Sequence, residues 1–344
     1  EWDFGMPWYR PTRVSHLTSG SEYGWRTGNS KWSPNYPDNL PATINIGQGS
    51  PTNVMFGAKA NFPSKYKKAL YAFDWSFGII YAIHLTPKGA TYEATAEEFI
   101  SGAPLPLTDG TIGPDGALYF ATGGRRLESD LYRVYYKGEL DTYTPLKEAD
   151  LPQEAKLRRE LEQFHAKGAS PAGLEKGWSN LNHPDRFVQY AARVAVEHQP
   201  VGSWKAKALA ETNSTSKIQA ILALAHQGTD ADAAAMLTSL MKVDYATLSA
   251  TDKQNILRTI EVILSRYDKG ASASKAQLVA YLDPHYPAED NLLNRSLSIL
   301  LVHLDAPSVV GKTLALLKDA KDDPNYQKTF MESSDLILRN PQYG

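Results

Sequence analysis

The chain has 344 residues, of which 42% are hydrophobic and 22% charged, and its formal net charge is −2. This length predicts about two domains, and the near-neutral charge argues against a dedicated nucleic-acid-binding protein. The sequence has no cysteine, which excludes disulfides, thiolate metal sites, a cysteine nucleophile and covalent haem attachment within these residues. No apolar run approaches the roughly 18 residues that a membrane-spanning helix needs.

The first 150 residues have the composition of a β-rich region. They contain 5 of the 7 Trp, 12 of the 19 Tyr and 7 of the 10 Phe residues, with recurring Gly, Pro and Asn. This composition favours many short strands over helices. We expect strands at residues 13–18, 43–46, 54–56, 68–75, 78–86, 96–101, 110–112, 117–122 and 130–136.

Residues 69–87 are the clearest of these elements and predict a β-hairpin with a tight turn at residues 76–78. The second strand is almost wholly apolar, as in strands that are buried on both faces. A second turn is predicted at residues 113–116, because Pro presets φ, Asp bonds to its own backbone and Gly accepts positive φ. A hairpin cannot be stable alone in water, so we expect neighbouring sheets.

Five segments of this region carry motifs that occur together. They are RVSHLTSGSEYGWR (13–26), GSPTNVMFG (49–57), YKKALYAFDWSFGIIYAIHL (66–85), PLPLTDGTIGPDGALYFATGGR (104–125) and LYRVYYKG (131–138). Together they resemble the soluble glucose/sorbosone dehydrogenase-like six-bladed propellers, in the version found in large multidomain bacterial proteins. The resemblance implies that residues 1–150 form a partial β-propeller. The remaining blades are then expected in a further segment of the same or another polypeptide.

In that family the enzymes use pyrroloquinoline quinone with a Ca²⁺ ion. The resemblance places Ser76 where the family has a lysine that contacts the quinone. It places Pro106 and Thr108 where two arginines bind the carboxylates of the cofactor, and neither residue reproduces bidentate arginine recognition. The family's catalytic His belongs to a segment upstream of these residues. Any quinone is therefore expected to be held differently here.

The resemblance also indicates which residues lie near the expected loop end of the propeller. The candidate substrate- or cofactor-binding residues are Arg13, His16, Trp25, Asp74, Trp75, Asp109, Arg125 and Arg126. Carboxylates, Trp and Arg together can hold a sugar ring by stacking and hydrogen bonds. The alternative interpretation is that the Trp residues fill the spaces between blades, the Asp residues cap turns and the His is structural. No catalytic residue and no metal ligand is assigned.

From about Leu151 the apolar period changes from 2 to 3.6. Residues 153–167 predict a polar amphipathic helix within a helical linker over residues 151–182. Apolar helical patterns then recur about every 30–40 residues, which is the period of a HEAT-like α-solenoid, predicted for residues 183–344. First helices are expected at 184–199, 214–227, 249–266 and 288–304, and second helices at 231–242, 272–282 and 308–318. Asn213 is expected to cap a helix.

Two functions remain open. In the first, the chain is part of a dehydrogenase-like protein that binds a sugar or alcohol at the propeller and passes electrons to a haem c domain outside these residues. In the second, it is a non-catalytic scaffold that binds a glycan or protein, with the helices docking a protein partner. The sequence starts at Glu1 without a signal peptide, and we interpret it as part of a longer or processed protein. The resemblance implies a periplasmic or extracellular location.

Overall fold

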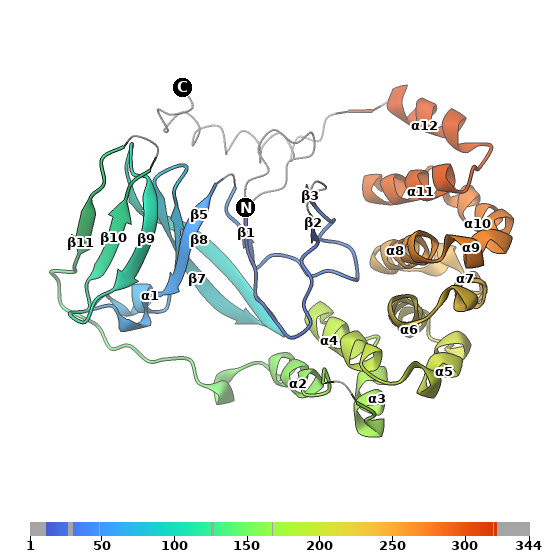
Figure 1. Cartoon of the computed structure of the whole chain (residues 1–344), viewed down its shortest axis with the longest axis horizontal. Helices are drawn as coiled ribbons and strands as arrows, with labels where there is room; N and C mark the ends of the chain where they lie inside the picture. Colours follow the sequence, from blue (N-terminus) through green and yellow to red (C-terminus); the bar gives the residue numbers. More distant parts are fainter. Residues whose placement is uncertain are drawn as a thin grey trace.

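A computed structural model describes residues 12–26, 30–47, 49–124, 127–166, 168–318 and 320–321. The protein is of mixed α+β class, with antiparallel sheets in the N-terminal part followed by a helical region (Figure 1). The change from strands to helices near Leu151 is therefore confirmed. Between residues 40 and 125 the longest α-helix in the described part is the single turn α1 (Ser64–Lys67).

A four-stranded sheet contains the predicted hairpin. Its strands follow one another in chain order and pair antiparallel: β5 (Pro51–Phe56), β6 (Leu70–Asp74), β7 (Ile79–Lys88) and β8 (Thr91–Ser101). β6 is buried along its whole length. The turn from β6 to β7 is closed by the N–H of Gly78, which donates to the Asp74 carbonyl at 3.1 Å, and Gly78 has a φ of 65° that disfavours a side chain.

A three-stranded sheet covers one face of the first. It consists of β9 (Leu107–Ile112), β10 (Leu118–Thr122) and β11 (Leu131–Val134). The two sheets enclose an apolar core that includes Tyr71, Phe73 and Leu118. The Thr52 hydroxyl and the Asn53 amide of β5 donate to the Leu107 and Gly110 carbonyls of β9 at 2.9 and 2.6 Å. The edge strands β5 and β9 of the two sheets are thus joined by hydrogen bonds.

Two short ladders complete the β part. β1 (Arg13–Val14) pairs with β4 (Ile44–Asn45), and β2 (Trp25–Arg26) pairs with β3 (Ser30–Lys31). Val14 and Ile44 pack on a second apolar cluster, formed mainly by β6 and β7. Each expected strand has a counterpart, although β1 is shorter and β8 longer than expected, whereas the β2–β3 pair was not predicted.

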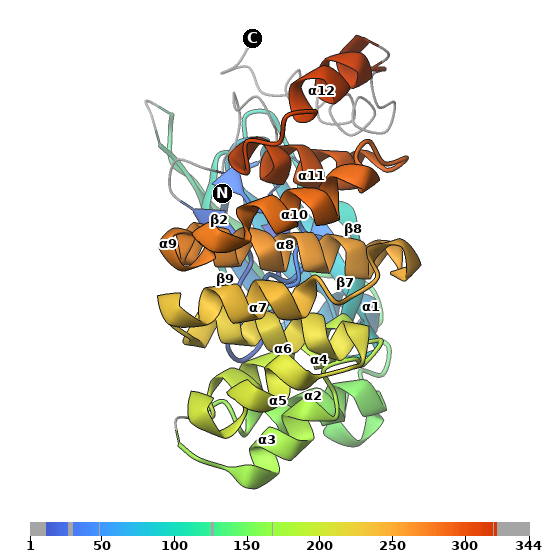
Figure 2. The same cartoon turned by 90° about the vertical axis from the view of Figure 1, so that its right-hand side faces the viewer.

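The helical region is a stack of paired helices (Figure 2). It comprises α2 (Gln153–Glu162), α3 (Pro171–Trp178), α4 (Arg186–Glu197), α5 (Lys205–Ala210), α6 (Ser214–Gln227), α7 (Ala233–Leu240), α8 (Ala250–Arg266), α9 (Asp268–Ala271), α10 (Lys275–Leu282), α11 (Asn291–His303) and α12 (Val309–Lys318). Each predicted first and second helix has a counterpart. The Asn213 side chain caps α6 by accepting from the Ser216 N–H at 2.9 Å, as expected.

The helix expected over residues 153–167 was wrong at its C-terminal end. α2 stops at Glu162, and α3 forms a separate helix that the sequence did not indicate. His165 follows α2 in an irregular segment, where its Nε2 donates to the Ala191 carbonyl of α4 at 2.9 Å. This contact turns the chain toward α4, so the helix cannot continue in its original direction.

The segment between β1 and β4 lies between the sheets and the helical stack (Figure 1). Its Asp38 forms a bidentate ion pair with Arg258 of α8, with the closest nitrogen and oxygen 2.7 Å apart and side chains only 5% and 8% exposed. The Arg258 guanidinium also lies 4.4 Å from the ring centroids of both Trp32 and Tyr36. The segment is therefore joined to the stack by a cation that carboxylate and aromatic groups enclose.

Further contacts join the sheets and this segment to α2 and α4. Arg186 of α4 donates from Nη2 to the carbonyls of Tyr36 and Asn39, at 2.6 and 2.8 Å. The four-stranded sheet is attached through Ala90, whose N–H donates to the Asp185 carboxylate at 2.8 Å and whose carbonyl accepts from Arg158 Nε at 2.9 Å. The sheets and the stack thus share hydrogen bonds at both sides of the segment.

We predict that Asp38→Ala destabilises the protein strongly, because it removes the buried bidentate partner of Arg258 and leaves only Glu261, which is 33% exposed and pairs with Arg258 Nη1 at 3.1 Å. Loss of one partner of a buried pair costs about 3–5 kcal/mol. Urea unfolding followed by circular dichroism measures the change in the free energy of unfolding. Glu93→Ala is the matched control, since Glu93 pairs with Lys88 at 2.8 Å but both side chains are exposed. Equal losses in the two variants would contradict the prediction.

Candidate functional site

Asp74 organises the turn between β6 and β7. Its Oδ1 accepts hydrogen bonds from the backbone N–H groups of Ser50, Ser76 and Phe77, at 3.3, 2.8 and 3.2 Å. The side chain is completely buried. An Asp at the end of a strand favours such a turn, because its short carboxylate reaches the N–H groups that follow it. Asp74 therefore lies beneath the turn and is not accessible to a ligand at the surface.

The second oxygen of Asp74 packs closely against the chain at Gly49. Oδ2 has no hydrogen-bond partner among the described residues. The backbone of Gly49 lies against it, since a Cβ at that position would stand 1.8 Å from Oδ2. Burial raises the pKa of Asp74 above its ordinary value, and the three N–H groups only partly oppose this shift. The position of the Asp74 carboxyl group thus requires glycine at position 49, because any side chain there would collide with Oδ2.

Trp75 connects this turn to neighbouring loops. Its indole Nε1 donates to the Gly123 carbonyl at 3.1 Å, and its backbone N–H donates to the Ser50 carbonyl at 3.2 Å. The Gly123 N–H in turn donates to the Pro106 carbonyl at 2.9 Å. Four loops that join consecutive strands therefore meet at one end of the two sheets. They are formed by residues 47 and 49–50, 74–78, 102–106 and 123–124.

The other residues predicted for this end occupy different settings. Asp109 lies in β9, is exposed, and its Oδ1 accepts from the N–H of Gly110 at 2.8 Å. Trp25 lies in β2 and is 51% exposed. Arg125 and Arg126 lie outside the described residues. Only Asp74 and Trp75 of the described candidates meet at the loop end.

The positions matched to the quinone-binding residues do not fit the cofactor. Ser76 is 1% exposed and Pro106 is buried. The Thr108 hydroxyl donates to the Ala121 carbonyl at 3.1 Å. These three side chains offer no positive charge to the carboxylates of the quinone cofactor. The residues at these positions therefore do not fit it. Among the described residues, no group of three or more His, Asp or Glu side chains is placed to hold a metal ion.

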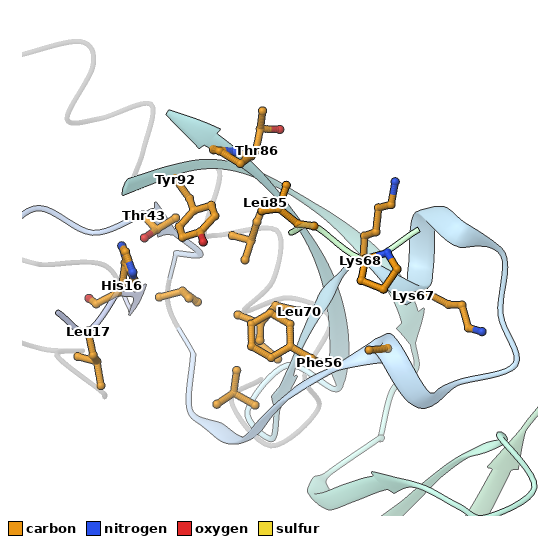
Figure 3. Close-up of a pocket in the computed structure, with 18 of the residues that line it drawn as sticks. His16, Leu17, Thr43, Phe56, Lys67, Lys68, Leu70, Leu85, Thr86 and Tyr92 are labelled. Carbon is orange, nitrogen blue, oxygen red and sulfur yellow. The ribbon is translucent and has the colours of Figure 1, made fainter. Parts of the chain in front are cut away.

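Arg13 and His16 line a large cavity on the second face of the four-stranded sheet, of about 1140 Å³. We call it the apolar groove, because its wall is formed largely by apolar side chains (Figure 3). These are Val14, Ile46, Val54, Phe56, Leu70, Ala72, Leu85, Tyr92 and Leu146. Lys67 and Lys68 lie at one side of the groove and His16 at the other.

His16 is held at the junction with the helices. Its Nδ1 is hydrogen-bonded to the Thr91 hydroxyl at 3.0 Å, and its ring stacks on Phe187 of α4 at 6.1 Å. Burial lowers the pKa of His16, and the nearby Arg158 cation lowers it further, so the ring is held neutral. The sequence placed His16 near Asp74, but Thr91 begins β8 and lies at the opposite end of the hairpin. β1 is held there by its pairing with β4.

The residues that the sequence did not single out are Val54 and Phe56 of β5, which are 57% and 62% exposed. Their alternation with the inward-facing Asn53 and Met55 was a usable signal. It identifies one face of the strand as buried, but whether the other face is covered depends on elements far away in the sequence.

We predict that Asp74 makes stability depend on pH. Because its pKa is raised on folding, the folded state binds the proton more tightly, and the free energy of unfolding falls as pH rises above about 4, the ordinary value. Asp74→Asn removes this titration, so its urea-unfolding profile from pH 4 to 8 should be flatter. The exposed Asp109→Asn should keep the original profile. Parallel profiles for Asp74→Asn and the unchanged protein would contradict the prediction.

Comparison with protein-family models, curated proteins and solved structures found no significant match for this chain. Within the described residues, no helix is both long enough and apolar enough to cross a membrane.

Proposed function

We propose that this chain is a docking scaffold, in which part of a β-propeller is joined to a HEAT-like stack and receives a further antiparallel sheet in the apolar groove. The observation that carries the proposal is the exposure of Val54 and Phe56, at 57% and 62%, on the wall of a cavity of about 1140 Å³. Exposed apolar surface of this extent is typical of interaction sites.

The arrangement of the sheets supports the propeller interpretation. The two larger sheets are consecutive antiparallel meanders that pack face to face, with β5 next to β9. Consecutive blades of a propeller have this relation. In this proposal β5–β8 and β9–β11 are neighbouring blades within residues 1–150.

A further sheet is the occupant that the groove fits best. One face of β5–β8 is already covered by the sheet β9–β11. On the other face, the β1–β4 ladder covers part of the apolar cluster and leaves the side near β5 open. β5 is also an edge strand of the described sheet. A sheet that continues the β1–β4 ladder would cover Val54 and Phe56 and complete the second face.

The described helices support a HEAT-like interpretation of the range 183–344, of which residues 319 and 322–344 lie outside the described part of the chain. The longer helices α4, α6, α8 and α11 contact one another in sequence, and α5 and α7 pack beside them (Figure 2). α2 and α3 pack on α4 and form the proposed linker over residues 151–182. Stacked helix pairs of this kind present extended surfaces for partners.

A dehydrogenase-like activity is the second candidate. Its support is the motif resemblance and the gathering of four connections at one end of the sheets. Substrate, haem c partner and a periplasmic or extracellular location remain proposals that follow from the resemblance. The settings of Ser76, Pro106 and Thr108 favour the scaffold over a quinone enzyme.

We predict that the apolar groove binds the fluorescent dye anilinonaphthalene sulfonate, because the aromatic rings of the dye bind exposed apolar surface. The double variant Val54→Glu and Phe56→Glu should reduce the fluorescence enhancement of the full chain at least about threefold, because it removes exposed apolar surface and places two carboxylates on the groove wall that repel the sulfonate of the dye. Dye titration with folded protein at neutral pH measures this effect.

Leu131→Glu is the control for the groove variant. Leu131 is 74% exposed on β11, outside the groove, so its replacement should leave most of the fluorescence. Circular dichroism verifies that each variant is folded. If the groove variant retained the dye signal while Leu131→Glu lost it, the apolar groove would not be the exposed docking surface.

We predict that pyrroloquinoline quinone with Ca²⁺ binds this chain more weakly than micromolar. Two or three charge-assisted contacts are lost relative to the family, each contributing about 1.5–3 kcal/mol. Isothermal calorimetry with the full chain measures the affinity. Submicromolar binding that persists in Arg125→Ala and Arg126→Ala would show that other groups recognise the cofactor and would support the dehydrogenase candidate.

A further inference from the structure

A second cavity, of about 310 Å³, lies where the N-termini of α4, α6 and α8 meet the segment that precedes β4. We call it the polar pocket, because its wall includes Asn35, Arg186, Gln189, Thr215, Asp252 and Asn255. Its volume is at the lower end of the roughly 300–1,000 Å³ range of small-molecule sites. Sites at the boundary between two parts of a chain are common for such ligands.

Asn255 of α8 brings a side-chain amide to the polar pocket. The residue is only 4% exposed, yet it lines the polar pocket. Its carboxamide makes no hydrogen bond to any described residue, although its backbone carbonyl accepts from the Thr259 hydroxyl at 2.7 Å. The amide is not among the fully buried polar atoms that lack a partner, which agrees with its position on the pocket wall. The amide thus offers donors and an acceptor to a molecule in the pocket.

Arg186 of α4 brings a cation to the same pocket. Its Nη2 is satisfied by two backbone carbonyls, while its other guanidinium nitrogens have no hydrogen-bond partner among the described residues. Burial lowers the pKa of Arg186 to about 10, and the attraction of Asp38 only partly opposes this shift. The guanidinium is therefore a desolvated charge that a planar carboxylate could pair with.

Asp252 supplies the complementary group. Its Oδ2 accepts hydrogen bonds from the hydroxyls of Thr215 and Ser249, at 2.9 and 3.2 Å, while Oδ1 has no partner among the described residues. A free carboxylate oxygen accepts from hydroxyl groups but repels carboxylates. The pocket thus holds one group for an anion and one group for alcohols.

We propose that the polar pocket binds a small hydroxylated carboxylic acid of the sugar-acid type. The carboxylate pairs with the Arg186 guanidinium and the Asn255 amide, and a hydroxyl donates to Asp252 Oδ1. A neutral sugar leaves the guanidinium without its anion, and a simple dicarboxylic acid leaves Asp252 without its donor. The ligand then bridges the helical stack and the segment that carries Asn35. This inference is independent of the scaffold proposal, because it uses a different cavity.

Isothermal calorimetry of the full chain with D-glucuronate, D-glucose and succinate tests the proposal. We expect saturable binding of D-glucuronate with an affinity at least tenfold higher than for either of the other two compounds. D-glucose lacks the carboxylate, and succinate lacks the hydroxyls. Equal binding of D-glucose, equal binding of succinate, or no D-glucuronate binding at millimolar concentration would each overturn the proposal.

Substitutions locate the binding in the polar pocket. Asn255→Asp places a negative charge beside the ligand carboxylate and should weaken D-glucuronate binding at least tenfold. Asn255→Leu removes the hydrogen bonds without adding charge, and serves if the aspartate variant does not fold. Gln254→Leu is the matched control, because Gln254 is a buried polar residue on the same helix that does not line the pocket. Undiminished affinity in a folded Asn255 variant would overturn the assignment.

Discussion

The burial of the Arg258 charge is the constraint on which the arrangement of the two halves depends. A guanidinium inside a protein needs a carboxylate and further polar or aromatic partners, or it destabilises the fold. Here Glu261 of the same helix supplies one carboxylate, and it is 33% exposed. The buried partners come from a segment some 220 residues earlier in the chain, which offers Asp38 and the rings of Trp32 and Tyr36. The helical stack therefore reaches its low-energy state only with this segment in place. Since the segment also leads into β4, the same pair positions the sheets.

The regular elements could be predicted because their causes are local. Apolar patterns of period 2 and 3.6, turn residues and the Asn213 cap depend on neighbours within a few positions. They indicated the strands and the longer helices. Elements that depend on contacts between residues far apart in the sequence were not predicted. The β2–β3 ladder has two residues on each side, too few to show a period. The end of α2 at Glu162 depends on a contact between His165 and α4. Local patterns thus determine which elements form, and distant contacts determine where some of them stop.

The candidate site was predictable only in part, for the same physical reason. Sequence cannot distinguish a carboxylate that closes a turn from one that faces a ligand, and the structure separates Asp74, fully buried, from Asp109, which is exposed. The polar pocket draws residues from Asn35 to Asn255, so no spacing reveals it. One local signal existed. Asn255 is a polar residue directly before the apolar Ile256 and Leu257 in the buried part of α8. A polar residue within such a run indicates a polar neighbour, although the sequence alone does not identify it.

The two cavities differ in chemistry, and this difference determines what each can hold. The apolar groove is wide, its wall is largely aliphatic and aromatic, and it adjoins the edge strand β5. Binding there must depend on the burial of a large apolar surface area, because few polar groups are placed to orient a small molecule. A sheet provides that area, together with backbone groups for β5. The polar pocket is about a quarter of the size but contains the unpaired groups of Arg186, Asp252 and Asn255. A protein surface too large to enter would leave these groups unsatisfied, whereas a small ligand with matching donors and acceptors would satisfy them. The groove is therefore suited to a macromolecule and the pocket to a small acid.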